Sequence, residues 1–419
     1  MRFPLREDDI SGSIPPRIKI RGILETVMTK IRVFLLTLGF LIVGFLGYFL
    51  ILYARGYHLN LKTWKFQPKG ILVIKTEPTG AQIFINADLK GASDSNFSLS
   101  PGVYDVDIKK EGFLPWSKRL TITKEIVTEA SLSLFKSTPA FSPITFSGAN
   151  FPVSSADLSK IAFSVLPAAG VEKDKIGLWV MDTSSLPLGF SRDPKRITDG
   201  DLTVATYQFS PSAREILLET GGGAFLLDTG NFIPQNQRVN IASQKITLLA
   251  SWEKERTNKL EAQIKNLPKE FQEFLRRKTY SFSFSPDETK VFYTASASGN
   301  LSEKLIPPLP GSSTQKEERA TTIDRTYVYD IKEDRNFLIE ENGISPDRKL
   351  FWLLNSKNLV LADSDKIIIM DYDGTNRQTI YSGSYLAPHV FPFINSSKLL
   401  ILTSLGSAST PNLYSLNLK

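Results

Sequence analysis

Residues 285–295 read SPDETKVFYTA, a polar turn followed by an apolar strand, and this short pattern decides how most of the chain folds. Ser-Pro-Asp favours a tight turn, because proline presets its own φ and the Asp side chain hydrogen-bonds the backbone that follows. After a gap, a second apolar strand, YVYD, ends at Asp330. Strands that are apolar on both faces must be covered on both faces, so the pattern predicts several sheets packed against one another.

The same unit recurs through residues 137–419. Each copy has a polar turn, a basic residue, an apolar strand, a gap and a second apolar strand. Five copies are visible, with their turns at residues 156–160, 210–215, 285–290, 345–349 and 395–398. At a period of roughly 45 residues, a stretch of this length predicts a β-propeller of about six blades, one of them hidden by divergence.

The unit resembles TolB-type and WD40-like propeller repeats, whose signature is Ser-Pro-Asp-Gly-x-Lys before an apolar strand. One copy supplies four residues at that spacing: Ser285, Pro286, Asp287 and Lys290. No copy keeps the glycine. The resemblance implies a propeller in which these residues are structural. We expect the ring to close by pairing of the stretch after Lys136 with the final strand, residues 413–416, because an open end would expose unpaired strand edges.

Two insertions interrupt the array. Residues 251–278 lack the sequence pattern of a strand and place apolar side chains at helical spacing. This pattern predicts a helical hairpin docked on the propeller. Its apolar stripe favours packing against the adjacent blade, with partner binding as the alternative. Residues 298–322 contain Pro307, Pro308 and Pro310 in a polar run. This predicts a mobile loop, or alternatively a polyproline recognition segment.

Residues 70–136 have a different sequence pattern, which predicts short strands separated by turns that contain Gly and Pro. Tyr104, Val106 and Ile108 alternate with Asp105 and Asp107, the pattern of a strand with one buried and one wet face. About 67 residues are enough for a small β-sandwich that folds alone.

This stretch resembles the PEGA domain. The resemblance rests on GILVIKTEPTGAQIFIN at 70–86, on SPGVYDVDIKKEGFLPW at 100–116 and on a closing strand that ends at Leu134. It departs at Thr79 and at Asn86-Ala87, where the family has Glu and an Asp-Gly turn. The motif residues, all expected to be structural, are Pro78, Gly80, Ala81, Pro101, Gly102, Tyr104 and Gly112. The resemblance implies an extracytoplasmic module that binds carbohydrate or protein; the alternative is a stalk that holds the next domain away from the membrane.

Residues 33–53, VFLLTLGFLIVGFLGYFLILY, carry no charge and would span about 32 Å as a helix. A cleaved signal peptide has a shorter apolar core and a small-residue cleavage site, so we expect an uncleaved transmembrane helix at 33–54, with a linker at 55–69. Five basic residues just before the span against four after it favour a cytoplasmic basic tail at 1–32. Apolar residues at helical spacing within 20–31 predict either an interfacial helix or an extension of the membrane helix.

Composition excludes several function classes. Lys plus Arg is 50 and Asp plus Glu is 43, but the whole excess of +7 lies in residues 1–69, and residues 137–419 are neutral. A neutral globular part argues against nucleic-acid binding. The absence of Cys excludes disulfides, thiol catalysis and Cys-ligated zinc, and only His58 and His389 are available for imidazole chemistry.

Three local motifs could have carried chemistry. Residues 371–376, DYDGTN, begin like a calcium loop, but Ser382 stands where a Glu is required, so we interpret them as an Asp-Gly turn. Gly221-Gly222-Gly223 precedes no helix and is interpreted as a flexible turn rather than a phosphate cradle. His389 has no second His near it in sequence, which favours a structural role. The sequence therefore predicts no catalytic, cofactor-binding or metal-binding residue.

These features together predict an all-β protein: one transmembrane helix, a PEGA-like β-sandwich at 70–136 and a propeller at 137–419. We expect a non-enzymatic binding protein of the bacterial cell envelope, anchored in membrane lipid by residues 33–54, with its C-terminal domains outside the cytoplasm. The expected partner is a protein or a cell-surface carbohydrate, and neither a cofactor nor nucleic acid is expected. One alternative is an envelope glycosidase or lyase with a propeller active site, because such sites gather carboxylates from several blades. The other is a structural scaffold of an envelope assembly.

Overall fold

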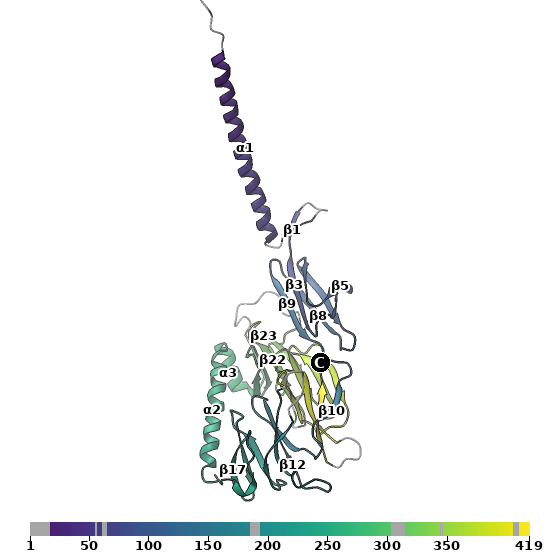
Figure 1. Ribbon diagram of the computed structural model, residues 1–419. Helices are drawn as coiled ribbons and strands as arrows, with labels where there is room; N and C mark the ends of the chain where they lie inside the picture. The colour runs from purple at the N-terminus through teal and green to yellow at the C-terminus, as the bar shows by residue number, and fades with distance from the viewer. Residues whose placement is uncertain are drawn as a thin grey trace, which may run out of the picture.

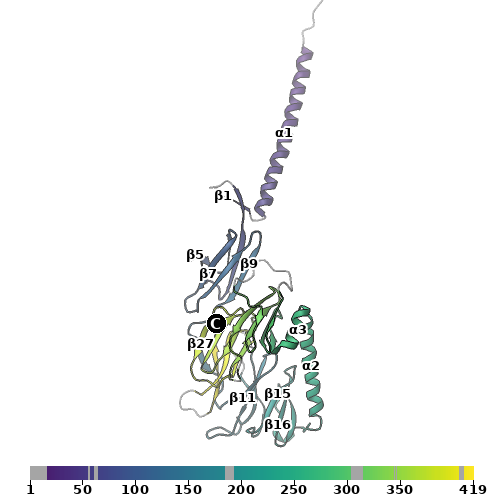
Figure 2. The same ribbon diagram turned by 180° about the vertical axis from the view of Figure 1, so that it is seen from behind.

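A computed structural model describes residues 17–54, 57–60, 65–184, 193–302, 315–343, 345, 347–404 and 410–419. One long helix leads into a small β-module, which sits on a larger β-body with two helices along its side (Figure 1). The same arrangement is seen from behind in Figure 2. The predicted fold class, a mostly β protein behind one N-terminal helix, is confirmed.

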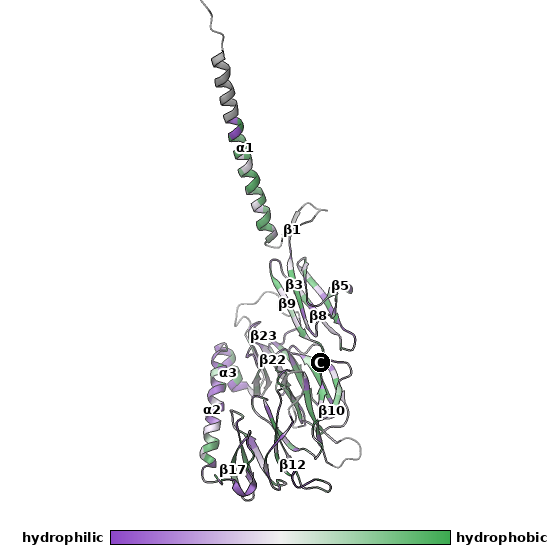
Figure 3. Cartoon of the chain, viewed as in Figure 1, coloured by the Kyte–Doolittle hydropathy of each residue, from purple (hydrophilic) through white to green (hydrophobic). Residues whose placement is uncertain are grey.

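Helix α1 runs without a break over Arg17–Ala54. Its start shows that residues 20–31 extend the apolar helix and do not form a separate interfacial one. Within Lys30–Ala54, an 18-residue window has a mean hydropathy of 2.5, and none of that window is buried inside the protein. In the cartoon of Figure 3, this part of α1 is mostly coloured as hydrophobic, with a hydrophilic band near its N-terminal end. The helix is therefore long and apolar enough to cross a membrane.

A short hairpin follows α1 where a linker was expected. Strand β1 (Tyr57–Asn60) pairs antiparallel with β2 (Lys65–Pro68). The Tyr57 hydroxyl donates a hydrogen bond to the Glu125 carboxylate at 2.7 Å, which ties the hairpin to the β-module that follows.

The β-module is a sandwich of two sheets, in the orders β6-β3-β9 and β5-β4-β7-β8. Its strands are β3 (Gly70–Glu77), β4 (Gln82–Ile85), β5 (Asp88–Ala92), β6 (Ser95–Leu99), β7 (Gly102–Lys109), β8 (Trp116–Ile122) and β9 (Val127–Ser133). Alternate residues point inward, so that Leu72, Ile74, Ile83, Val106 and Ile108 form a fully buried core.

Within the described residues, the larger body contains five sheets of three or four strands, which we number in chain order. Sheet 1 is β11 (Asn150–Ser154), β12 (Lys160–Val165), β13 (Gly177–Asp182) and β14 (Lys195–Asp199); sheet 2 is β15 (Thr206–Phe209), β16 (Glu215–Thr220) and β17 (Gly223–Asp228). Sheet 3 is β18 (Thr279–Phe284), β19 (Lys290–Ala295), β22 (Thr326–Asp330) and β23 (Arg335–Glu340). Sheet 4 is β24 (Lys349–Trp352), β25 (Asn358–Ala362), β26 (Lys366–Asp371) and β27 (Gln378–Ser382). Sheet 5 is β28 (Val390–Pro392), β29 (Lys398–Thr403), β30 (Asn412–Asn417) and β10 (Ala140–Pro143).

The repeated units of the sequence correspond to these sheets. In sheets 1, 2, 3 and 5 the two predicted apolar strands of a unit are neighbours that pair antiparallel. The fourth unit needs a correction, because residues 345–349 precede the first strand of sheet 4 instead of joining its first two. The equivalent turn lies at residues 353–358, where Asn355 accepts hydrogen bonds from the amides of Lys357 and Asn358.

Successive sheets pack face to face, and the described residues form five sheets of three or four strands where about six blades were expected. Buried side chains join sheet 5 to sheet 1, sheet 1 to sheet 2, sheet 3 to sheet 4 and sheet 4 to sheet 5. Between sheets 2 and 3 the contacts pass through α2 (Lys245–Lys265) and α3 (Lys269–Lys278). Trp252 of α2 packs on sheet 2, and Phe271 of α3 packs on sheet 3. The helical insertion thus links sheets 2 and 3 through its contacts, and it lies along one side of the body (Figures 1 and 2).

The two ends of the body meet in sheet 5. β10 pairs antiparallel with β30, with Phe141 opposite Leu416. The predicted pairing of the stretch after Lys136 with the last strand is confirmed.

The insertion at 298–322 is described only at its two ends. There, β20 (Gly299–Asn300) pairs with β21 (Ala320–Thr321). Pro307, Pro308 and Pro310, on which the polyproline alternative depended, lie outside the described residues.

Candidate functional site

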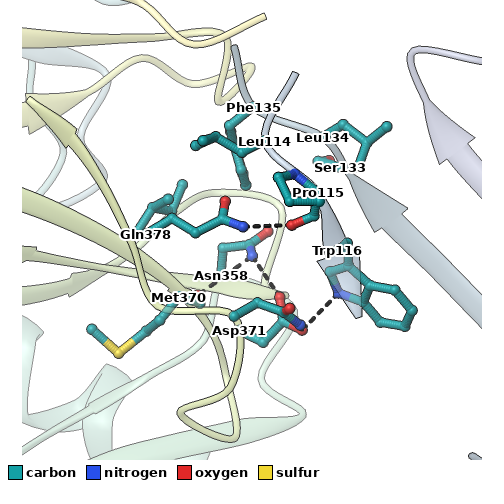
Figure 4. Close-up of a pocket in the computed structure, with 12 residues that line it drawn as sticks. Leu114, Pro115, Trp116, Ser133, Leu134, Phe135, Asn358, Met370, Asp371 and Gln378 are labelled. Carbon is teal, nitrogen blue, oxygen red and sulfur yellow. Dashed lines mark hydrogen bonds between the residues drawn. The ribbon is translucent and has the colours of Figure 1, made fainter. Parts of the chain in front are cut away.

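The two β-parts of the molecule meet where the start of β8 contacts the turn between β26 and β27 (Figure 4). The indole Nε1 of Trp116 donates to the Asp371 carboxylate at 2.8 Å. The backbone amide of Ser117 donates to the Asn376 side chain at 3.0 Å, and the Gln378 side chain donates to the Pro115 carbonyl. These bonds, from neighbouring residues on both sides, fix the β-module on sheet 4.

Lys118, the next inward-facing residue of β8, brings a buried charge to this contact. Its Nζ lies 2.6 Å from Asp373 Oδ2 and 3.9 Å from Asp371 Oδ2, and the Lys118 and Asp373 side chains are 11% and 0% exposed. Burial alone would lower the pKa of Lys118, but Asp373 and Asp371 outweigh it, and the pKa is raised. Burial also raises the pKa of Asp371, although Lys118 opposes it. Lys118 therefore stays protonated and pairs with Asp373, while Asp371 beside them accepts hydrogen bonds from Trp116 and Asn376.

Sheet 3 contributes to the same cluster. Two ammonium groups lie over the Tyr372 ring, with Lys118 Nζ at 5.3 Å and Lys290 Nζ at 4.7 Å from its centroid. Lys290 also lies 3.6 Å from Asp330. Each of these charges has an opposite partner, as buried charges require. The cluster accordingly holds the β-module, sheet 3 and sheet 4 in fixed positions relative to one another.

The interpretation of residues 371–376 as a turn is confirmed. They connect β26 to β27, with Gly374 at φ +79° and its amide hydrogen-bonded to the Asp371 carbonyl at 2.9 Å. Asp373 accepts from the Thr375 hydroxyl at 2.6 Å. Within the described residues, no group of three or more His, Asp or Glu side chains is placed to hold a metal ion.

Beside the buried cluster, a cleft of about 660 Å³ opens between the outer face of β7 and β8 and the propeller. Arg119 and Asp105 form an ion pair at 2.7 Å on its wall, and the Ser117 hydroxyl donates to Asp107 at 2.5 Å. Gln315 and Thr375 face them from the propeller side. The side chains that line the cleft are mostly polar and form hydrogen bonds. The hydrogen bond from Arg119 holds the pKa of Asp105 below its ordinary value.

Most motif residues predicted from the β-module stand at its turns, and none of them lines the cleft. Gly80 holds φ +76° after Pro78, and the amides of Gly80 and Ala81 both bond Ser93. Pro101 and Gly102 lead into β7, where the Tyr104 hydroxyl donates to the Ser100 carbonyl at 2.9 Å.

Gly112 lies nearer the propeller. It holds φ +78°, and its carbonyl accepts from the Ser137 amide at 3.0 Å.

The propeller motif residues form the turn between β18 and β19. The Ser285 hydroxyl donates to Asp287 at 2.7 Å and accepts from the Lys290 amide at 3.0 Å, and Pro286 lies between them in the turn. Of the predicted residues, only Lys290 reaches the junction, through its ammonium group.

Sequence reasoning missed Trp116, Lys118 and Gln378, and it did not connect Asp371 or Asp373 with the β-module. More than 250 residues separate Trp116 from Asp371, and no local spacing relates them. The one available signal was that DYDGTN places two carboxylates beside a strand end. His389 is half-buried, stacks on Phe391 at 6.4 Å, and has its pKa lowered by burial, which supports its structural interpretation.

Comparison with known proteins identifies the β-module. Residues 69–138 match the PEGA domain, so the chain contains a PEGA domain followed by propeller-like sheets. No curated protein matches the sequence significantly.

Among solved structures, the chain is similar to TolB from Acinetobacter baumannii, with 12% identity over 75% of this chain and 59% of that one, at a TM-score of 0.22. It is similar to the β-propeller domain of Myceliophteria thermophila Cps50 (Swd1), with 11% identity over 63% of this chain and 65% of that one, at 0.18. The chain is also similar to a eukaryotic initiation factor, with 10% identity over 85% of this chain and 92% of that one, at a TM-score of 0.19. The chain thus spans less than two thirds of the first two structures. The propeller assignment here rests on the five packed sheets and not on these low scores.

Proposed function

We propose that this protein is a membrane-anchored, non-catalytic binding protein of the bacterial cell envelope, which recognises a protein or carbohydrate outside the cytoplasm. The observation that carries the proposal is the polar cleft between the PEGA domain and the propeller. Because buried, paired charges fix the two parts together, the cleft keeps its shape without a ligand, and preorganised sites lose less entropy on binding.

The state of the cleft carboxylates supports binding over catalysis. A glycosidase needs a carboxylic acid whose pKa is raised so that it can donate a proton. Asp105 has its pKa lowered by Arg119, and it therefore remains an anion. Asp371, whose pKa is raised by burial, does not line the cleft, because its carboxyl group is buried at the junction and accepts a hydrogen bond from Trp116. Paired charges on an open wall suit recognition of a polar partner by complementarity.

The test compares two exposed ion pairs of the PEGA domain. Arg119–Asp105 lies in the cleft, at 2.7 Å with side chains 65% and 56% exposed. Lys75–Glu129 lies on the other sheet, at 3.0 Å with side chains 55% and 51% exposed. We would place a photo-crosslinking amino acid at Arg119 or at Lys75 in the full chain, irradiate intact cells, and identify the adduct.

A protein or glycan adduct at Arg119 that is absent at Lys75 is the expected result, and its chemistry distinguishes the two partner classes. Arg119→Ala should then weaken binding of that partner more than Lys75→Ala. Equal adducts at both positions would contradict recognition through the cleft. Turnover of envelope glycan that is lost in Asp105→Asn would instead favour the enzyme.

A further inference from the structure

A second pocket, of about 480 Å³, lies between the end of α1 and the near end of the PEGA domain. Tyr53 and Ala54, the last two residues of α1, form one wall. Lys69, Ile71 and Val127 are among the residues of the opposite wall, from the segments that open β3 and β9. The pocket belongs to neither the cleft nor the buried charge cluster.

The position of the pocket is fixed by local hydrogen bonds. Tyr57, three residues after α1, donates to Glu125 at 2.7 Å. The Glu125 amide donates to the Lys69 carbonyl at 3.0 Å, and the Ile71 amide donates to the Ile126 carbonyl at 3.0 Å. These bonds hold this end of the PEGA domain beside the end of the apolar helix. If α1 crosses a bilayer, as the proposed function requires, the pocket lies at the level of the lipid headgroups.

The walls combine apolar and charged groups as a headgroup region does. Ile71 and Val127 are β-branched and are 40% and 57% exposed. The exposure of their apolar surface to water is unfavourable in free energy. Tyr53 is 69% exposed at the helix end, where tyrosines are enriched at membrane interfaces. Lys69 makes no ion pair within the part of the chain described, and Glu125 adds one carboxylate. One cation and one anion at an apolar wall complement a zwitterionic group.

We propose that this pocket binds a phospholipid of the bilayer that α1 crosses. The lipid is an aminophospholipid, with its phosphate at Lys69, its ammonium at Glu125 and its upper acyl chain against Ile71 and Val127. The PEGA domain is then seated on the membrane surface through this end and does not swing freely on α1. The inference rests on the proposed membrane insertion of α1.

The test uses the absence of native Cys, which allows single labels on the full chain. Val127→Cys reports the pocket, and Leu89→Cys on edge strand β5 is a control of matched exposure, 57% against 58%. Leu41→Cys, 66% exposed within α1, reports membrane insertion. Each variant is spin-labelled in nanodiscs of phosphatidylethanolamine and phosphatidylcholine, and its collision rates with oxygen and with a water-soluble nickel chelate are compared.

A severalfold higher oxygen-to-nickel ratio at Val127 than at Leu89 is expected, with a higher ratio still at Leu41. Equal ratios at Val127 and Leu89, with Leu41 in lipid, would overturn the lipid site and leave the anchor intact. A water-exposed Leu41 would overturn both the anchor and the lipid site.

The headgroup is tested by the charges. Lys69→Gln and Glu125→Gln should each lower the ratio at Val127, whereas Lys75→Gln, an exposed lysine on β3 outside the pocket, should not. Replacing phosphatidylethanolamine with phosphatidylglycerol should also lower it. A ratio that is unchanged or raised in phosphatidylglycerol would overturn the assignment of an aminophospholipid.

Discussion

Single residues in left-handed backbone conformations explain how this sequence tolerates departures from its motifs. In the turn between the first two strands of each sheet, one residue that is not glycine has φ between 54° and 59°: Leu158, Ala213, Glu288, Ser356 and Ser396. In the third turn this is the position of the glycine in the propeller signature. Asn86 and Ala87 likewise have φ of 50° and 66°, where PEGA domains have Asp-Gly. Each such residue costs free energy because its Cβ crowds the backbone.

Ala87→Gly should stabilise the PEGA domain by about 1 kcal/mol, because glycine adopts positive φ without that crowding. Ala92→Gly, on the exposed edge strand β5, is the matched control and should destabilise by about 0.5–1 kcal/mol through lost backbone entropy. Denaturant unfolding of the full chain measures both. A loss of stability in Ala87→Gly would contradict the conformation of this turn.

Asp287 predicts a pH dependence. Burial raises its pKa, but hydrogen bonds from Ser285 and Thr289 outweigh burial and hold the pKa below the ordinary value of 3.8. A lowered folded-state pKa stabilises the fold above pH 3.8, and that stabilisation is lost as the pH falls through the folded pKa. Asp287→Asn removes the titration and keeps an acceptor, as Asn355 does in the turn of sheet 4.

The unfolding free energy of Asp287→Asn should therefore fall less between pH 5 and pH 3 than that of the parent. The measurement is urea unfolding at fixed ionic strength across this range. Asp201→Asn serves as a control outside the repeated turns, since Thr203 lowers the pKa of that fully exposed carboxylate too. Parallel curves for the parent and Asp287→Asn would rule out the proposed linkage.

At the scale of elements, the helical pair completes the packing of the propeller. Phe271 of α3 is fully buried, with its ring centroid 4.0 Å from that of Tyr329 and 5.8 Å from that of Tyr293. The Arg256 side chain of α2 donates to the Phe209 carbonyl of sheet 2, and Gln263 donates to Glu288 of sheet 3. The pair contacts both neighbouring sheets, as an inserted blade would.

Phe271→Ala should destabilise the propeller by about 3–5 kcal/mol, because it leaves a cavity among packed aromatic rings. Ile246→Ala on α2, a site 81% exposed, should change stability by less than about 0.5 kcal/mol. Thermal unfolding by circular dichroism distinguishes the two. Similar small effects would show that the helices are an appendage.

At the scale of the whole molecule, chain segments far apart in sequence close the body and join its parts. β10 completes sheet 5 from the N-terminal side, and the Lys136 amide donates to the Leu418 carbonyl at 2.8 Å. The Lys419 ammonium lies 2.6 Å from Glu77 of the PEGA domain. The last strand therefore supports both the ring and the junction.

Deleting residues 411–419 should destabilise the propeller by several kcal/mol, on the order of the loss of a buried strand. β30 lies between β29 and β10, so its removal leaves two unpaired edges. Deleting Lys419 alone removes one ion pair to an exposed carboxylate and should cost less than about 1 kcal/mol. The melting temperature reports both changes, and an unchanged value in the longer deletion would show that closure does not need β30.

The topology of the whole chain is tested by a single cysteine at Val204, which is 85% exposed on the propeller. We expect a membrane-impermeant maleimide to label Val204→Cys in intact spheroplasts, because the charge count around α1 favours an internal N-terminus. Leu41→Cys should stay unlabelled. Labelling of Val204→Cys only after lysis would place the propeller in the cytoplasm.

Local patterns were enough to predict most elements. The uncharged run before residue 54 specified α1, and the alternation around Asp105 and Asp107 specified β7. The repeated apolar strands of sheets 1, 2, 3 and 5 were also found, since period and turn chemistry depend on neighbouring residues. The fourth unit was misplaced because residues 345–347 read Ser-Pro-Asp, as the third turn does, whereas the turn that joins the first two strands of sheet 4 reads Leu-Leu-Asn at 353–355.

The sequence by itself thus determined the apolar helix, the PEGA sandwich, the repeated sheets and the closing strand. Only the tertiary structure decided that a helical pair lies between sheets 2 and 3, that Lys118 pairs with Asp373 beside Asp371, and that a polar cleft forms next to them. The reason is physical. Secondary structure follows hydrophobic periodicity within about 20 residues, whereas a buried ion pair depends on which surfaces exclude water together, and that is settled only when segments hundreds of residues apart pack.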